Sequence, residues 1–268
     1  MISIVIPAHN EANRIGANLA LLTGAGSDDF EIIVVPNGCT DATASVAAQV
    51  PGVQVIDLPA PGKAAALRVG DAAAKAFPRI YLDADIPLTP VQVRALAAAV
   101  ERPGVLAATG ARRVTTEGSS LLVRAFYAVN KRLPAYRDAL YGRGVIAVSE
   151  SGRSRFAEFP DQVADDLFLD SMFSAAEKHH EPTVVSTVAA PRRTAHLVGR
   201  LARLRAGNRA LRATATAAIR PARNSSWLKD VVLPRPWLWP AGICYAAIIL
   251  AAERSARRAG EVTWGHQA

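Results

Sequence analysis

The amino-acid sequence predicts an α/β fold with a mostly parallel, mixed sheet flanked by helices. Short β-rich runs alternate with helical segments through residues 1–90, and polar side chains follow directly after three of these runs. Strands at this spacing favour right-handed βαβ units, which bind ligands beyond the carboxyl ends of their strands. We therefore expect one ligand site at that edge, formed by residues 7–11, 36–41 and 83–85.

The predicted elements follow one another in order. Apolar runs predict strands at 2–6, 31–35, 53–58, 80–82, 105–109, 145–148 and 183–188. Helical patterns cover 10–22, 40–50, 63–77, 90–101, 121–133 and 161–170. Asn10 is suited to cap the first of these helices, and Thr40 with Asp41 the second.

Composition sets the broad class of the protein. Half of the 268 residues are hydrophobic and a fifth are charged, which is typical of a folded chain with a full core. Two distant cysteines, Cys39 and Cys244, and an N-terminus unlike a signal peptide favour a cytoplasmic protein. The net charge of +8 indicates an acidic partner: a nucleotide, a nucleic acid or an anionic membrane surface.

The run at 80–82 ends in two carboxylates, Asp83 and Asp85, one residue apart. If extended geometry persists, both side chains point the same way. Hard divalent cations prefer carboxylate oxygens, so we expect this pair to bind Mg²⁺ or Mn²⁺ that bridges to a diphosphate. The alternative is a polar strand end with two solvated acids.

The other loops at this edge offer groups that suit a nucleotide. Residues 7–11 place backbone amides near a helix N-terminus, where anionic ligands are stabilised. The amide of Asn37 suits the edge of a nucleobase, and Lys63 after Gly62 supplies a cation beside a phosphate. Each feature alone is equally consistent with exposed polar residues, and their convergence favours a binding site.

Four motifs, VIPAHNE, VVPNGCTDAT, GKAAALRVG and YLDADIPLT, together resemble the family 2 glycosyltransferases of the GT-A fold. The resemblance is close over residues 2–88 and looser to about Arg193. It implies a metal-dependent, inverting transfer of a sugar from a nucleotide-diphosphate donor to a hydroxyl group. The nucleotide-sugar contacts that it implies are Pro7, Ala8, Asn10, Glu11, Asn37, Lys63, Asp83 and Ala84.

The resemblance also implies the catalytic and acceptor residues. It places the catalytic base at Asp166 with Asp165 as its neighbour, and a carboxylate beside another carboxylate tends to have a raised pKa, which suits a base. Acids in a first helical turn are also a common structural feature. The acceptor site is expected near Gly142, Arg143 and Gly144. Asn37 stands where the family usually carries an acid, and no Gln-x-x-Arg-Trp motif is present, so the donor stays open.

The composition changes in the second half, which predicts a GT-A domain at 1–195 and a basic, apolar helical appendage at 196–268. The domain divides into a nucleotide-binding half at about 1–90 and an acceptor half at about 91–195. Residues 182–228 contain no acid, and a leucine-bearing helical face there is flanked by arginines. The leucines are Leu197, Leu201, Leu204 and Leu211, and the arginines are 192, 193, 200, 203, 205, 209, 212, 220 and 223.

A basic amphipathic helix indicates an anionic surface, although a helix docked on the core is an equal alternative. Within the apolar stretch 231–252, the uninterrupted part covers 241–252, shorter than the ~20 residues of a membrane span. Trp237 and Trp239 with arginines 254, 257 and 258 resemble an interfacial anchor. We therefore expect peripheral membrane contact, with a packed helix or subunit contact as the alternative.

Three other functions compete with transfer to a lipid-linked or glycan acceptor. The arginine-rich segment also suits a nucleic acid or modified base as acceptor. A sugar-nucleotide pyrophosphorylase shares this type of fold, but its glycine-rich triphosphate loop is missing here. A non-catalytic sugar-nucleotide-binding module is disfavoured because Asp83, Asp85 and Asp166 are all present.

Overall fold

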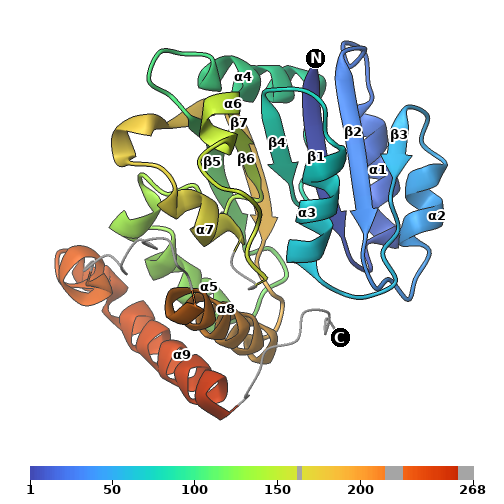
Figure 1. The fold of residues 1–268 in the computed structure, drawn as a ribbon. Helices are drawn as coiled ribbons and strands as arrows, with labels where there is room; N and C mark the ends of the chain where they lie inside the picture. Colours follow the sequence, from blue (N-terminus) through green and yellow to red (C-terminus); the bar gives the residue numbers. More distant parts are fainter. Residues whose placement is uncertain (162–164, 215–225, 259–268) are drawn as a thin grey trace.

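A computed structural model describes residues 1–161, 165–214 and 226–258 (Figure 1). Its centre is a seven-stranded sheet with the strand order β3-β2-β1-β4-β6-β5-β7. The strands are β1 (Ile2–Ala8), β2 (Phe30–Pro36), β3 (Val53–Val55), β4 (Arg79–Leu82), β5 (Ala107–Thr115), β6 (Val145–Val148) and β7 (Lys178–Ala189).

The sheet is mixed because a single strand runs against the others. Strands β1 to β4 pair in parallel, β6 is antiparallel to both β4 and β5, and β5 pairs in parallel with β7. The carboxyl ends of β1, β2, β4, β5 and β7 therefore lie at one edge of the sheet. This confirms the predicted α/β class and the edge at which the sequence places the ligand loops.

Helices cover both faces of the sheet (Figure 1). They are α1 (Ala12–Leu22), α2 (Thr43–Ala48), α3 (Lys63–Ala73), α4 (Pro90–Val100), α5 (Leu121–Asn130), α6 (Glu150–Arg153) and α7 (Asp165–Ser171). Helix α4 begins with a complete capping box between Thr89 and Gln92, which satisfies backbone donors that have no partner inside the helix. The predicted helix at 161–170 partly falls outside the described residues, since 162–164 are not described.

Strand β1 is buried along its whole length because both faces of the sheet are covered. Ile4 packs in a cluster with Leu19 and Leu96, whereas Val5, the next residue, packs in a second cluster with Phe159 and others. Successive side chains of a strand point to opposite faces. The continuous apolar runs of the sequence thus supply both layers of the core.

Several predicted boundaries were wrong. Strand β3 is three residues long, and beyond it Leu58 forms only an isolated bridge with Asn37. Strands β5 and β7 are longer than predicted, because they pair with each other over nine residue pairs with one register irregularity after Gly110. Helix α6 was not predicted. These lengths depend on partner strands, which sequence periodicity does not report.

Both predicted helix caps were also wrong. Helix α1 has Glu11 at its N-cap without a side-chain capping bond, while Asn10 takes a φ of 54° and accepts a hydrogen bond from the Thr40 amide at 2.8 Å. Helix α2 begins at Thr43, whose amide donates to the Asp41 carboxylate at 3.0 Å. Asn10 therefore joins the two loops to each other, and neither predicted cap residue caps its helix.

A buried ionic cluster fixes β4 beneath the site. The carboxylate of Asp71 on α3 accepts from Tyr81 at 2.6 Å and pairs with Arg79 at 2.5 Å and Arg153 at 2.6 Å. The Asp71 side chain is 6% exposed, and a buried charge needs such partners. The cluster ties α3 and α6 to the strand that leads into Asp83.

The C-terminal helices form a third core cluster with α5. Helix α8 (Thr194–Thr214) and helix α9 (Trp239–Arg258) lie beside α5 at one end of the molecule, with α9 outermost (Figure 1). The rings of Phe126 on α5 and Tyr245 on α9 stack at 4.8 Å. Glu253 on α9 pairs with Arg205 of α8 at 2.7 Å. This packing bears out the alternative of a docked helix, and the domain boundary at 195 stays a prediction.

The predicted leucine face of α8 is only partly buried. Leu197 and Leu211 are fully buried, whereas Leu204 is 44% exposed. Arg220 and Arg223 lie outside the described residues.

Helix α9 is longer than the sequence suggested. The stretch Pro236–Arg258 forms 23 helical residues whose length and composition would suffice to cross a membrane, and 28% of its 18-residue apolar part is buried against the protein. Pro240 falls in the first turn of α9, where the missing N–H has no helical partner to lose. The helix extends the apolar run 241–252 at both ends, and peripheral membrane contact stays a prediction.

Candidate functional site

The chain turns sharply after β4. Strand geometry ends at Leu82, and the Ile86 amide donates to the Asp83 carbonyl at 3.0 Å, which closes a turn. The extended geometry from which we placed Asp83 and Asp85 on one side is therefore absent. The two carboxylates still influence each other, since burial and then the charge of Asp83 raise the pKa of Asp85.

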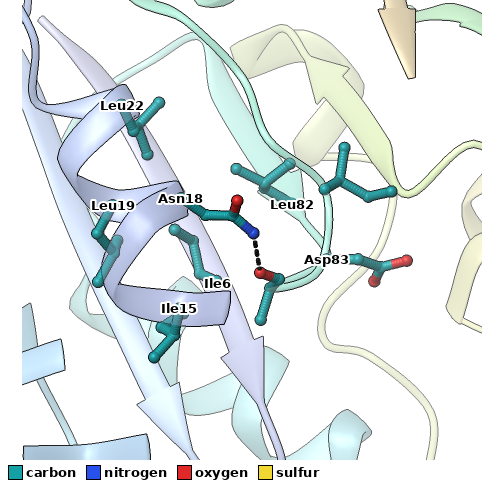
Figure 2. Close-up of a pocket in the computed structure, with 9 residues that line it drawn as sticks. Ile6, Ile15, Asn18, Leu19, Leu22, Leu82 and Asp83 are labelled. Carbon is teal, nitrogen blue, oxygen red and sulfur yellow. Dashed lines mark hydrogen bonds between the residues drawn. The ribbon is translucent and has the colours of Figure 1, made fainter. Parts of the chain in front are cut away.

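The turn is held from behind by α1. Figure 2 shows the Asn18 side chain donating to the Ala84 carbonyl at 2.8 Å, with the Asp83 carboxylate pointing away from the helix. The small pocket at this place is lined mainly by apolar side chains such as Leu19 and Leu82. It is therefore part of the packing that fixes the turn, and the functional groups lie on the opposite side.

Lys63, the first residue of α3, bridges two acidic motifs. Its ammonium group lies 2.7 Å from Asp83 and 3.0 Å from Asp165. Burial opposes the charged form, but Asp165 and Asp83 outweigh it and hold the pKa of Lys63 well above its usual range. The acids that the sequence assigned to metal binding and to catalysis thus meet at one cation.

Asp166 lies in the first turn of α7, beside this cluster. Its carboxylate accepts hydrogen bonds from the Gly142 amide at 2.9 Å and the Leu167 amide at 2.8 Å. Burial, and next the charge of Asp165, raise its pKa to about 6, although Lys63 opposes the shift. A carboxylate with such a pKa can accept a proton near neutral pH.

The loop at 142–144 connects the two acidic motifs. Gly142 donates to Asp166, and the Gly144 carbonyl accepts from the Asp83 amide at 2.8 Å. Both glycines have a positive φ, 72° and 71°, which few other residues adopt. At Gly144 a Cβ atom would also lie 2.5 Å from the Ile86 side chain, so only glycine fits there.

Arg143 does not extend toward an acceptor. Its guanidinium donates to the carbonyls of Ala139, Gly110 and Tyr136 at 3.0, 3.0 and 2.5 Å. Burial, together with the nearby charge of Arg112, lowers its pKa to about 10. The expectation of an acceptor contact through this side chain was wrong, because the buried guanidinium is needed to hold the loop.

Asn37 likewise has a structural role. Its side chain is fully buried, donates to the Ala8 carbonyl at 2.8 Å and accepts from the Gly62 amide at 3.0 Å. The amide therefore joins the ends of β1 and β2 to the start of α3 and presents no free edge to a base. Pro7 and Ala8 are buried within β1, so only their backbone can face a ligand.

Glu11 stands closer to the acidic turn than the sequence indicated. Burial, and next the charge of Asp85, raise the pKa of Glu11. Arg14 approaches Asp85 at 3.9 Å. Within the described ranges, no three His, Cys, Asp or Glu side chains are grouped tightly enough to hold a metal by themselves. The protein therefore offers Asp83 and Asp85 as a pair with Glu11 nearby.

A known protein family matches more than half of this chain. The family model described as glycosyl transferase family 2 matches residues 3–152. Comparison with the curated protein sequences gives no significant match.

Two solved structures are similar in fold. A mannosyltransferase from Pyrobaculum calidifontis in complex with GDP-Man and Mn²⁺ is 21% identical, with 97% of this chain and 76% of that chain covered at a TM-score of 0.60. A glucosyl-3-phosphoglycerate synthase from Mycobacterium tuberculosis in complex with Mn²⁺, UDP and glucosyl-3-phosphoglycerate is 24% identical, with 80% and 79% covered at a TM-score of 0.56.

The family match covers more than half of the chain and includes the turn after β4, Lys63 and the loop at 142–144. The fold similarity extends over nearly the whole chain. The chain therefore belongs to glycosyl transferase family 2 and is a glycosyltransferase of the GT-A type.

Proposed function

We propose that this glycosyltransferase transfers a sugar from a nucleoside-diphosphate donor to a hydroxyl group, with inversion and with the help of Mg²⁺ or Mn²⁺. The observation that carries the proposal is the cluster in which Lys63 contacts Asp83 and Asp165, with Asp166 beside them. The cluster places the Lys63 ammonium group and the Asp83 carboxylate, which suit binding of the donor diphosphate, next to Asp166, which can accept the proton of the acceptor hydroxyl.

The residues around the turn fit a divalent cation. Asp83 and Asp85 carry hard oxygen donors. Desolvation, and next the charges of neighbouring acids, raise the pKa of both Asp85 and Glu11, so negative charge is concentrated at this turn. A bound divalent ion stabilises charge that develops on a leaving diphosphate. The fold neighbours include a mannosyltransferase complex with Mn²⁺ and a sugar nucleotide, which supports the same choice here.

Asp166 is the best candidate for the base. The acceptor oxygen attacks the anomeric carbon, the bond from that carbon to the diphosphate oxygen breaks, and the acceptor proton passes to the Asp166 carboxylate. The raised pKa suits this role. Lys63 supplies positive charge next to both the donor and the base, and attack opposite the leaving group inverts the anomeric centre.

The C-terminal helices support a lipid-linked acceptor and peripheral membrane contact. The outer side of α9 and the turn before it expose large apolar side chains, Trp237, Trp239, Ile243 and Leu250. Arg254, Arg257 and Arg258 follow at the end of the helix. Tryptophans and arginines of this kind favour the interface of an anionic membrane, here the cytoplasmic face. The tests below also distinguish a lipid-linked acceptor from a soluble glycan and from a nucleic acid.

A direct assay tests the central proposal. Purified full-length protein is incubated with UDP- and GDP-sugars, with Mn²⁺ or with a chelator, and released nucleoside diphosphate is measured with and without lipid-phosphate and glycan acceptors. We expect metal-dependent release that an acceptor accelerates. Binding without release in any combination would instead support a non-catalytic sugar-nucleotide-binding module.

A further inference from the structure

Strand β5 carries a second group of charged residues to the edge of the sheet that holds Asp83. Strand β6 is antiparallel to both β4 and β5, so β4 and β5 run in the same direction. The end of β5 extends beyond its pairing with β6 and pairs only with β7, where Arg112 lies opposite Ser186. Arg112 therefore lies in the part of the sheet that extends beyond β6, on the acceptor half of the molecule.

Arg112 has no acidic partner in the described part of the chain. Its guanidinium lies over the ring of Tyr136 at 4.6 Å, and Nη1 donates to Asn130 at 3.4 Å. The Nε atom is buried and has no hydrogen-bond partner. No carboxylate within the described ranges forms an ion pair with the half-buried Arg112, whereas the buried Arg79 pairs with Asp71 at 2.5 Å.

A second guanidinium makes this arrangement less favourable. Arg143 is buried beside Arg112 and bonds only to backbone carbonyls. The charge of Arg112 adds to burial in lowering the pKa of Arg143. Two neighbouring, partly desolvated cations without an acid are costly for a protein, and a bound anion removes that cost.

Helices α5 and α8 bring two further groups to this place. Tyr127 lies one turn before Asn130, the residue of α5 to which Arg112 donates, and it belongs to the same core cluster as Leu197 of α8. Arg200 lies one turn after Leu197 on α8, is exposed, and forms no ion pair with a carboxylate in the described part of the chain. Arg112, Tyr127 and Arg200 are therefore contributed by three elements that pack together.

We propose that Arg112 and Arg200, with the hydroxyl of Tyr127, form an anion subsite that binds a phosphate group of the acceptor. Guanidinium groups bind phosphate through paired, charge-assisted hydrogen bonds. The assignment to the acceptor rests on the proposed function, because the donor diphosphate is placed at Asp83, Asp85 and Lys63. A polyprenyl phosphate and a soluble phosphorylated acceptor share this chemistry.

Phosphate binding tests the subsite without requiring turnover. Full-length protein is saturated with GDP or UDP plus Mn²⁺, and binding of inorganic phosphate, glycerol phosphate and farnesyl phosphate is measured by calorimetry. We expect Arg112→Gln and Arg200→Gln to weaken phosphate binding by about tenfold to a hundredfold, as is typical for loss of a charged hydrogen bond. Arg113→Gln is the matched control, because Arg113 is the exposed neighbour of Arg112 on β5.

The outcomes separate this inference from the proposed function. Weak binding in the Arg112 and Arg200 variants, with normal binding in Arg113→Gln and normal GDP or UDP affinity, supports the subsite even if no transfer is found. A preference for farnesyl phosphate over glycerol phosphate then indicates a lipid source. The inference is overturned if the wild type binds none of the three phosphates, if both variants bind like the wild type, or if they lose the nucleotide instead. Arg112→Lys controls for misfolding of the Arg112→Gln variant. It keeps the positive charge, so it should retain part of the affinity for phosphate.

Discussion

The ammonium group of Lys63 lies 3.0 Å from the carboxylate of Asp165. Lys63 opens α3 in the nucleotide-binding half of the sequence, and Asp165 opens α7 in the acceptor half. The same ammonium group also contacts Asp83 at 2.7 Å. One side chain therefore joins the donor side of the candidate site to the catalytic side, and the predictions below begin with it.

Replacing Lys63 by Met should raise the pKa that governs the base. The positive charge of Lys63 favours the ionised form of Asp166, so its removal makes proton release from Asp166 harder. We expect the acidic limb of the pH profile of kcat/KM to move to higher pH and the activity at pH 7 to fall. The control is Lys75→Met, which changes an exposed lysine, and an unshifted limb in Lys63→Met would contradict the assignment.

The wild-type pH profile follows from the raised pKa of Asp166, about 6. A base works only when deprotonated, so kcat/KM should be level above that value and fall about tenfold for each pH unit below it. An ordinary aspartate, with a pKa near 3.8, would keep the rate level down to about pH 4. The profile is measured between pH 4.5 and 8, and a level rate at pH 5 would exclude Asp166 as the base.

Substituting Asp166 by Asn should stop transfer and leave donor binding intact. Asn has nearly the same shape but cannot accept the proton, and loss of a general base typically lowers the rate by ~10² to 10⁴-fold. Asp161→Asn, at a carboxylate that is 82% exposed, should behave like the wild type. Normal turnover of Asp166→Asn together with an inactive Asp165→Asn would move the base to Asp165.

Substituting Asp85 by Ala should abolish metal-dependent donor binding while the fold is kept. Among the described residues, Asp85 forms an ion pair with the exposed Arg14 side chain alone, at 3.9 Å, and such pairs contribute little to stability. Wild-type protein at a ligand concentration 100 times the Kd should gain roughly 2.7 kcal/mol of stability. Thermal shift with GDP and UDP, each with and without Mn²⁺, measures this, and an equal Mn²⁺-dependent shift in the variant would refute metal binding at Asp85.

The membrane proposal is best tested by surface changes on α9. Deleting the helix would strip Tyr245 from Phe126 and uncover the apolar side of α5, so a truncated protein would report on folding as well. Ile243→Gln with Leu250→Gln changes only exposed positions, 74% and 57% exposed. We expect the pair to remove binding to anionic liposomes that persists in high salt, because apolar insertion depends on buried area.

Val91→Gln provides the control for this experiment, since Val91 is 76% exposed and its helix, α4, lies at the opposite end of the molecule from α9 (Figure 1). Co-sedimentation over a range of salt concentrations gives the readout. Full-length protein that stays in the supernatant at every salt concentration would end the membrane proposal. Salt-sensitive binding to RNA or DNA, unaffected by liposomes, would favour a nucleic-acid acceptor.

The sequence alone determined the class of fold and the edge of the sheet that carries the site. Apolar runs such as 2–6 and 145–148 are buried on both faces, so their composition reports strands without knowledge of their neighbours. The motifs around Asp83 and Lys63 indicated the family, because residue type and spacing within a loop are local properties of the sequence.

Only the tertiary structure decided what individual side chains do. Asn37 and Arg143 look like free polar groups in the sequence, yet both are buried and bonded to carbonyls from other segments. The turn at Asp83 is stabilised by Asn18 of α1, and Lys63 meets Asp165 only after the two halves of the chain pack together. Such contacts join residues far apart in the chain, and they arise because buried polar groups must find partners wherever packing brings them. Periodicity and composition describe neighbours along the chain, so they cannot specify these partners.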